Sequence, residues 1–164
     1  MREARPSSRI ETLLERLSST TAIAHDDELF DNLHLEQHIR HQPHIHKPHH
    51  THANRLLSNN AKTHNLAALV RATAARLDAA ARPDADAQAV DAAAAALLVT
   101  RALLKHMLDT LEPEDMLEQL ADGPAAAGSE LVAALLVNSL LAVIASARLD
   151  DGTYWLHMEA LTAL

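Results

Sequence analysis

Residues 131–147 read LVAALLVNSLLAVIASA, and this stretch contains no charged side chain. Ser129 and Glu130 stand directly before it, as is typical of the start of a helix. About twenty apolar residues are needed to cross ~30 Å of hydrocarbon, and this stretch is shorter and is interrupted by Asn138 and Ser139. A helix that is apolar on all sides must be buried by something. The stretch therefore predicts the central helix of an all-α bundle, with a dimer interface or membrane insertion as alternatives.

The composition of the whole chain agrees with an all-α fold. The 164 residues include one Phe, one Tyr and one Trp, although 48% of the residues are hydrophobic. The core must therefore consist mainly of Leu, Ala, Val and Ile, which suit packed helices better than β-sandwiches. A chain of this length fits one compact domain. We expect residues 1–62 to hold N-terminal helices and a His-rich loop, and residues 63–164 to form the body of the bundle.

Six further stretches carry helix signals. Apolar periodicity, acidic first turns and flanking prolines predict helices at residues 9–18, 26–42, 63–81, 84–111, 113–121 and 154–164. Apolar periodicity disappears between residues 43 and 62, where two prolines interrupt the chain, so we predict a long loop there. Together these signals predict a single bundle of five to seven helices.

Two of the predicted helices have a recognisable apolar face. In residues 63–81 this face comprises Leu66, Leu69, Val70, Thr73, Ala74 and Leu77. In residues 84–111 the stripe comprises Val90, Ala94, Leu97, Leu98, Leu104 and Leu108. We expect both faces to line the core.

Histidine is concentrated in one segment of the chain. Ten of the twelve histidines lie between His25 and His64, and residues 38–52 read HIRHQPHIHKPHHTH. His34, His38 and His41 have the spacing i, i+4, i+7, which places their rings on one face of a helix. A pair at i, i+4 is a common helical metal clamp, whereas His34 and His41 lie about 10 Å apart along the axis, too far to hold one ion together.

We therefore expect one pair, either His34 and His38 or His38 and His41, to bind a metal together with imidazoles from the segment that follows. The predicted ligands are His34, His38, His41, His44, His46, His49 and His50. Neutral imidazole suits divalent zinc, nickel or copper, and the residues do not choose among them. Two alternatives remain: a linker that binds metal only in vitro, and a segment that gains positive charge as the pH falls through about 6.

Several classes of function are excluded or disfavoured by what the sequence contains. The chain has no cysteine, which leaves nitrogen and oxygen as metal ligands and removes thiol nucleophiles. His34 is followed by Leu35, so the zinc-protease spacing is missing, and glycine-rich phosphate loops and a serine-hydrolase elbow are missing as well. The net charge of −8 and the few aromatics argue against nucleic-acid binding. The N-terminus lacks a secretory apolar segment, so we expect a cytoplasmic protein.

The sequence thus predicts a non-enzymatic protein that binds a transition metal for storage, delivery or sensing. The competing hypothesis is an α-helical interaction or regulatory module, acting on a protein partner or as a homodimer, in which the His segment is a linker or a pH-responsive tether. A catalytic metal centre would need an open coordination position and a pocket, and neither can be read from the residues. His106 and His157 lie inside helical patterns and are interpreted as ordinary helix residues.

Overall fold

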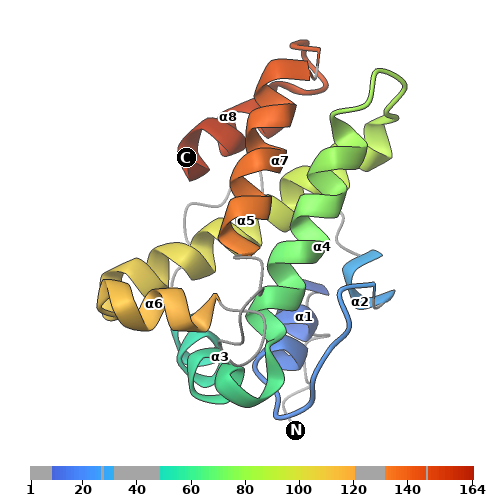
Figure 1. Cartoon of the computed structure of the whole chain (residues 1–164). Coiled ribbons are helices and arrows are strands. Elements are labelled where there is room, and N and C mark those ends of the chain that lie inside the picture. The colour runs from blue at the N-terminus through green and yellow to red at the C-terminus, as the bar shows by residue number, and fades with distance from the viewer. Residues whose placement is uncertain (1–8, 27, 32–48, 121–131, 147) are drawn as a thin grey trace, which may run out of the picture.

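The computed structural model describes residues 9–26, 28–31, 49–120, 132–146 and 148–164. Within these residues it contains eight helices and no strand, which confirms the all-α class (Figure 1). The helices are α1 (Arg9–Leu17), α2 (Glu28–Asp31), α3 (His49–Thr63), α4 (Asn65–Ala80), α5 (Ala87–Thr110), α6 (Pro113–Gln119), α7 (Val132–Ser146) and α8 (Tyr154–Ala163). The predicted helices at residues 9–18, 63–81, 84–111, 113–121, 131–147 and 154–164 are therefore confirmed to within a few residues at their ends. The predicted helix at 26–42 is represented by α2, and residues 32–42 lie outside the described part.

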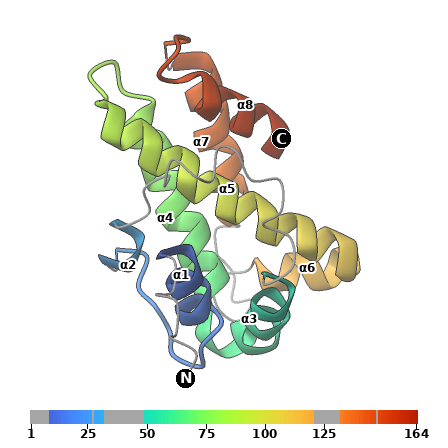
Figure 2. The same ribbon diagram turned by 180° about the vertical axis from the view of Figure 1, so that it is seen from behind.

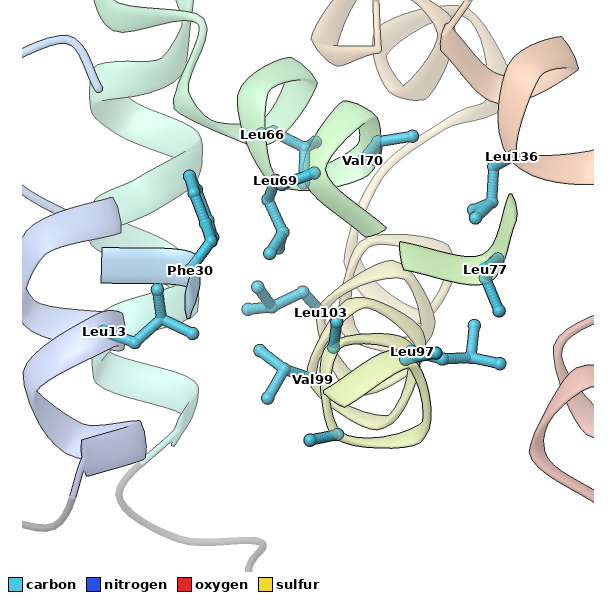
Figure 3. Close-up of a cluster of buried hydrophobic side chains, with 14 of the residues drawn as sticks. Leu13, Phe30, Leu66, Leu69, Val70, Leu77, Leu97, Val99, Leu103 and Leu136 are labelled. Atoms are coloured by element: carbon cyan, nitrogen blue, oxygen red, sulfur yellow. The ribbon is translucent and has the colours of Figure 1, made fainter. Parts of the chain in front are cut away.

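The central helix of the fold is α4. It packs mainly against α5 and α7 and also contacts α1 and α3 (Figures 1 and 2). Eleven of its sixteen residues are buried, and they include all six members of the predicted apolar face. Figure 3 shows Leu66, Leu69, Val70 and Leu77 of α4 among side chains from α1, α2, α5 and α7. The core therefore forms around α4, with α1–α3 at one end and α7 and α8 at the other.

The expectation that residues 131–147 form the centre of the bundle is wrong. One face of α7 is buried, mainly through Leu136, Leu140 and Val143, but Val137 and Leu141 are 44% and 51% exposed. The helix packs against α4 and α8 only on that buried side, and its opposite side meets solvent. An apolar sequence shows that a helix can be buried, but it does not say how many neighbours will cover it.

The prediction of a loop at residues 43–62 is also wrong over residues 49–62, which belong to α3. The buried positions of this helix are Ala53, Leu56, Asn60 and Thr63, whose spacing is helical. Two of the four are polar, and for this reason a search for apolar periodicity alone does not detect the helix. Residues 43–48 lie outside the described part of the chain.

The predicted stripe of α5 is only partly correct. Val90, Ala94 and Leu97 are buried as expected, whereas Leu108 is 66% exposed. The core-facing residues near the C-terminal end of the helix are instead Leu103 and Met107. This helix is also long and apolar enough to cross a membrane by length and composition, but half of its most apolar window is buried inside the protein. The core helices of soluble proteins are often as long and as apolar as this one.

The contact between α4 and α5 is built from small side chains. On α5, Ala93 and Ala96 share the face of Thr100 and are almost completely buried, which leaves room for the backbone of α4 to approach closely. The hydroxyl groups of Thr73 and Thr100 meet across this contact, with their oxygens 2.8 Å apart. Each hydroxyl can donate or accept, so the buried pair satisfies itself without water.

Two buried asparagines hold the corner between α3 and α4. His64 alone separates the helices and has a φ of 52°, a left-handed conformation that histidine tolerates better than most residues. The Asn65 amide donates to the carbonyls of Leu17 and Thr21, each at 3.0 Å, and its oxygen accepts from the Ile23 N–H at 2.8 Å. These bonds attach the chain that follows α1 to the first residue of α4.

Asn60 makes the matching connection on the other side of the corner. Its amide nitrogen donates to the Gln119 carbonyl at 2.8 Å and to the Gln119 side-chain oxygen at 3.0 Å, and its own oxygen accepts from the Leu66 N–H at 2.9 Å. The two asparagines therefore join α1, α3, α4 and α6 at one point.

We predict that Asn65→Ala lowers the free energy of unfolding by about 2–4 kcal/mol, because it removes the buried hydrogen bonds to the Leu17 carbonyl and from the Ile23 N–H. Urea denaturation followed by circular dichroism measures this loss. The matched control is Asn54→Ala on the exposed side of α3, where the expected loss is below about 1 kcal/mol. Equal losses in the two variants would show that the corner does not depend on Asn65.

Candidate functional site

The predicted metal ligands fall almost entirely outside the described residues. His34, His38, His41, His44 and His46 lie in residues 32–48, which the structure does not describe. His49 and His50 form the first turn of α3, but the description does not extend to their side chains. The metal hypothesis therefore remains a prediction from the sequence.

The histidines whose surroundings are described lie on different parts of the fold. The Nδ1 atom of His52 is 3.3 Å from the Ser18 hydroxyl, and the Nε2 atom of His106 is 2.8 Å from the Asn54 side-chain oxygen. His157 is buried on α8 and donates from Nδ1 to the Thr153 carbonyl at 3.0 Å. Among the described residues, no three His, Asp or Glu side chains are placed to hold one metal ion.

A different feature stands out at the C-terminal end of the chain. Most of the large exposed apolar side chains of the described residues belong to α7, α8 and the turn between them. We define the C-terminal apolar surface by the six of them that lie on the two helices: Val137, Leu141, Tyr154, Trp155, Met158 and Leu161. Each is between 42% and 58% exposed. The two helices that carry it pack against each other at one end of the molecule (Figures 1 and 2).

Both helices are apolar on two opposite sides. In α8, Leu156 and Ala160 face the core with no exposed area, while Tyr154, Met158 and Leu161 follow the spacing i, i+4, i+7 on the exposed side. In α7, Leu140 is 1% exposed and the next residue, Leu141, is 51% exposed. A helix at the surface of a monomer normally has polar residues on its outer side. On these two helices the large exposed side chains are mostly apolar, and no charged residue lies on the outer side.

Polar contacts fix α8 in place beneath this surface. Arg101 of α5 donates to the Glu159 carboxylate of α8 at 2.8 Å, and both side chains are largely buried. Their ion pair ties α8 to α5 and neutralises the only charged residue of α8. Because Glu159 is paired with Arg101 on the inner side of α8, the large side chains on the outer side of this helix are apolar or aromatic.

The turn between α7 and α8 is organised by Asp150. Its carboxylate accepts from the N–H groups of Gly152 at 2.9 Å and Thr153 at 3.1 Å. The bond from the Thr153 N–H is the main reason that the pKa of the Asp150 carboxyl lies below its ordinary value, although the group is exposed to solvent. The Thr153 hydroxyl also donates to the Arg148 carbonyl. Asp150 therefore has a structural role at the start of α8, as expected for an acidic residue in a turn.

The electrostatic character of this region differs from that of the rest of the body. Residues 65–164 contain six basic and fourteen acidic residues, yet α7 contains none of either kind. The C-terminal apolar surface is thus an uncharged area on an acidic protein. Its geometry can bury apolar side chains of another molecule.

The sequence matches the family described as dymeclin, the Dyggve-Melchior-Clausen syndrome protein, over residues 2–164. The chain belongs to the dymeclin family. The range matched to the dymeclin family includes both the His-rich segment and the helices that carry the C-terminal apolar surface. Comparison with curated proteins and with solved structures gives no match.

Sequence reasoning predicted the helices of this surface but not the surface itself. The absence of charge in residues 131–147 was interpreted as a sign of complete burial, and a dimer interface was kept as an alternative. A second signal was present in YWLHMEALTAL, where apolar residues surround the helix instead of forming one stripe. Two consecutive helices with this property indicate a surface that another molecule can cover.

We predict opposite outcomes for two leucines on α8. Leu156→Ala is expected to cost about 2–4 kcal/mol of unfolding free energy because its side chain is completely buried, and Leu161→Ala is expected to cost less than about 1 kcal/mol because its side chain is 58% exposed. Urea unfolding of the purified chain measures both. If Leu161→Ala were as damaging as Leu156→Ala, the outer side of α8 would have to be covered within a single molecule.

Proposed function

We propose that this protein is a non-enzymatic, α-helical interaction module that binds a protein partner through the C-terminal apolar surface. The observation that carries the proposal is the exposure of Leu141, Trp155 and Leu161 on two adjacent helices that have almost no charge. Exposed apolar areas of this kind mark interaction sites in monomeric proteins. Aromatic residues and Met are also enriched at such interfaces.

The size of the surface supports a specific contact. Six side chains about half exposed leave on the order of 400 Å² of apolar area open to solvent. One side of a standard protein interface buries about 800 Å², of which a little over half is apolar. Polar contacts at the rim would supply the remainder. The surface is therefore large enough to form the apolar centre of an interface.

The charge of the chain favours a protein partner over a lipid bilayer. Peripheral membrane helices usually combine an apolar side with Lys and Arg that attract anionic headgroups. Here α7 has no charged residue, α8 has only the paired Glu159, and the chain carries a net charge of −8. An anionic membrane surface would repel this body. As part of the same proposal, we place the protein in the cytoplasm.

Photo-cross-linking in cells tests the interaction. We predict that a photoreactive phenylalanine analogue in place of Met158 gives a discrete covalent adduct with a protein, because the side chain is 42% exposed on the proposed surface. The matched control is the same analogue in place of Leu117 on α6, which is 52% exposed and lies outside the surface. Identical adduct patterns at the two positions, or none at Met158, would contradict the proposal.

Metal binding by the His-rich segment is a second candidate function. It is favoured by one observation, the concentration of ten of the twelve histidines between His25 and His64. Under this proposal His34 and His38 clamp a divalent zinc, nickel or copper ion together with ligands from residues 44–50. The metal would then serve in storage, delivery or sensing, and no catalytic step is assigned to it.

Calorimetric titration with zinc, nickel and copper at pH 7 tests this second candidate. A specific site predicts one ion per chain at submicromolar affinity, with a loss of at least about tenfold when His34 and His38 are both changed to Gln. The chain should be purified without a metal column or a His tag, and His106→Gln serves as the control. Many weak sites that tolerate the double change would identify the segment as a linker.

A further inference from the structure

The outer side of α7 has a regular arrangement of small and large residues. Ala134, Leu141 and Ala145 follow the spacing i, i+7, i+11, so they lie along one line on the helix. All three are exposed, and Val137 and Asn138 flank the line and are exposed as well. A large residue between two small ones allows a second helix to approach closely while Leu141 fills the space between them. The line is about 16 Å long at 1.5 Å per residue.

The charge of this helix restricts what can cover it. A charged side chain placed against α7 would lose water without gaining a counter-charge, because Val132–Ser146 has no Lys, Arg, Asp or Glu. The face that covers α7 must therefore be uncharged. Among the described helices of ten or more residues, α7 is the only one without any charged residue, and the single charged residue of α8, Glu159, is paired with Arg101 of α5.

We propose that the occupant is α7 of a second copy of this chain, packed antiparallel across a two-fold axis close to Leu141. This inference rests on the proposed interaction function and names its partner. In a two-fold contact the same surface is used by both copies, so the uncharged side of one α7 meets the uncharged side of the other. Antiparallel helices also bring opposite ends of their dipoles together.

The role of Asn138 follows from this arrangement. Its side chain is exposed in the single chain and flanks the line of contact. An asparagine beside the contact disfavours any register that would bury its amide without a hydrogen-bond partner, and so restricts how the two helices can slide along each other. The remaining contacts are apolar and would fix the register less strictly.

The salt dependence of the dimer distinguishes an apolar contact between two acidic copies from a contact that depends on ion pairs. Each copy has a net charge of −8, so two copies repel each other at low ionic strength, and the contact itself contains no ion pair. Salt screens the repulsion and leaves the apolar contact intact. Raising the sodium chloride concentration from 50 to 500 mM is therefore expected to strengthen the dimer. A contact that depended on ion pairs would weaken.

Light scattering coupled to size-exclusion chromatography is the first measurement. The full chain is expected to change from monomer to dimer between about 1 and 200 µM, because a contact centred on one helix pair belongs to the small interface class. Leu141→Asp and, separately, Val137→Asp are expected to give monomers with an unchanged helical spectrum. Leu117→Asp, on the exposed side of α6, is the matched control and should still dimerise.

Cysteine cross-linking gives an independent geometric test. The chain has no cysteine, so Leu141→Cys introduces a single thiol. If Leu141 lies near the two-fold axis, mild oxidation should convert most of this variant into a covalent dimer at 100 µM. Leu117→Cys should remain largely uncross-linked under the same conditions.

These experiments distinguish failure of the dimer proposal from failure of the proposed interaction function. A monomer at 200 µM, or a dimer that survives both Leu141→Asp and Val137→Asp, overturns the second copy as the partner of α7. If the Met158 photo-adduct then has a mass other than two copies of the chain, the interaction function stands with a different partner. If there is neither a dimer nor a photo-adduct, both proposals fail.

Discussion

The fold depends on the corner between α3 and α4, where the single residue His64 turns the chain and two buried asparagines satisfy the backbone around it. Asn65 binds the chain after α1, and Asn60 binds the end of α6 and the start of α4. Hydrogen bonds of this kind contribute little net stability, but unmade ones are costly in a buried position. The corner therefore selects one arrangement of the N-terminal helices. It also positions α4, against which α5 and α7 pack.

The sequence predicts a helix and its packing well where the apolar residues of that helix are also its buried residues. In α4 the two agree, because every member of its predicted face, from Leu66 to Leu77, is buried. In α3 they do not agree, because Asn60 and Thr63 occupy buried positions through hydrogen bonds that involve residues distant in the chain or on the previous turn. In α7 the composition indicated a helix that could be buried, and the number of its neighbours was set by tertiary packing. Local patterns thus predicted helices well and their surroundings less well.

The same distinction applies to the candidate sites. The metal hypothesis was based on residue type and spacing. Its ligands from His34 to His46 lie outside the described residues, and the side chains of His49 and His50 are not described. The interaction surface was based on burial, which no sequence pattern states directly. Leu140 and Leu141 are adjacent and chemically identical, yet one is in the core and the other is half exposed. Only the packing of α7 against α4 and α8 tells them apart.

The aromatic residues give the molecule an unusual optical property. The chain has one tryptophan and one tyrosine, and the two are neighbours on α8 with ring centroids 6.1 Å apart. The single phenylalanine, Phe30, is the aromatic residue of the core. Intrinsic fluorescence and near-ultraviolet circular dichroism of this protein therefore come almost entirely from the C-terminal apolar surface. These signals report little about the interior of the protein, but they are sensitive to any molecule that covers α8.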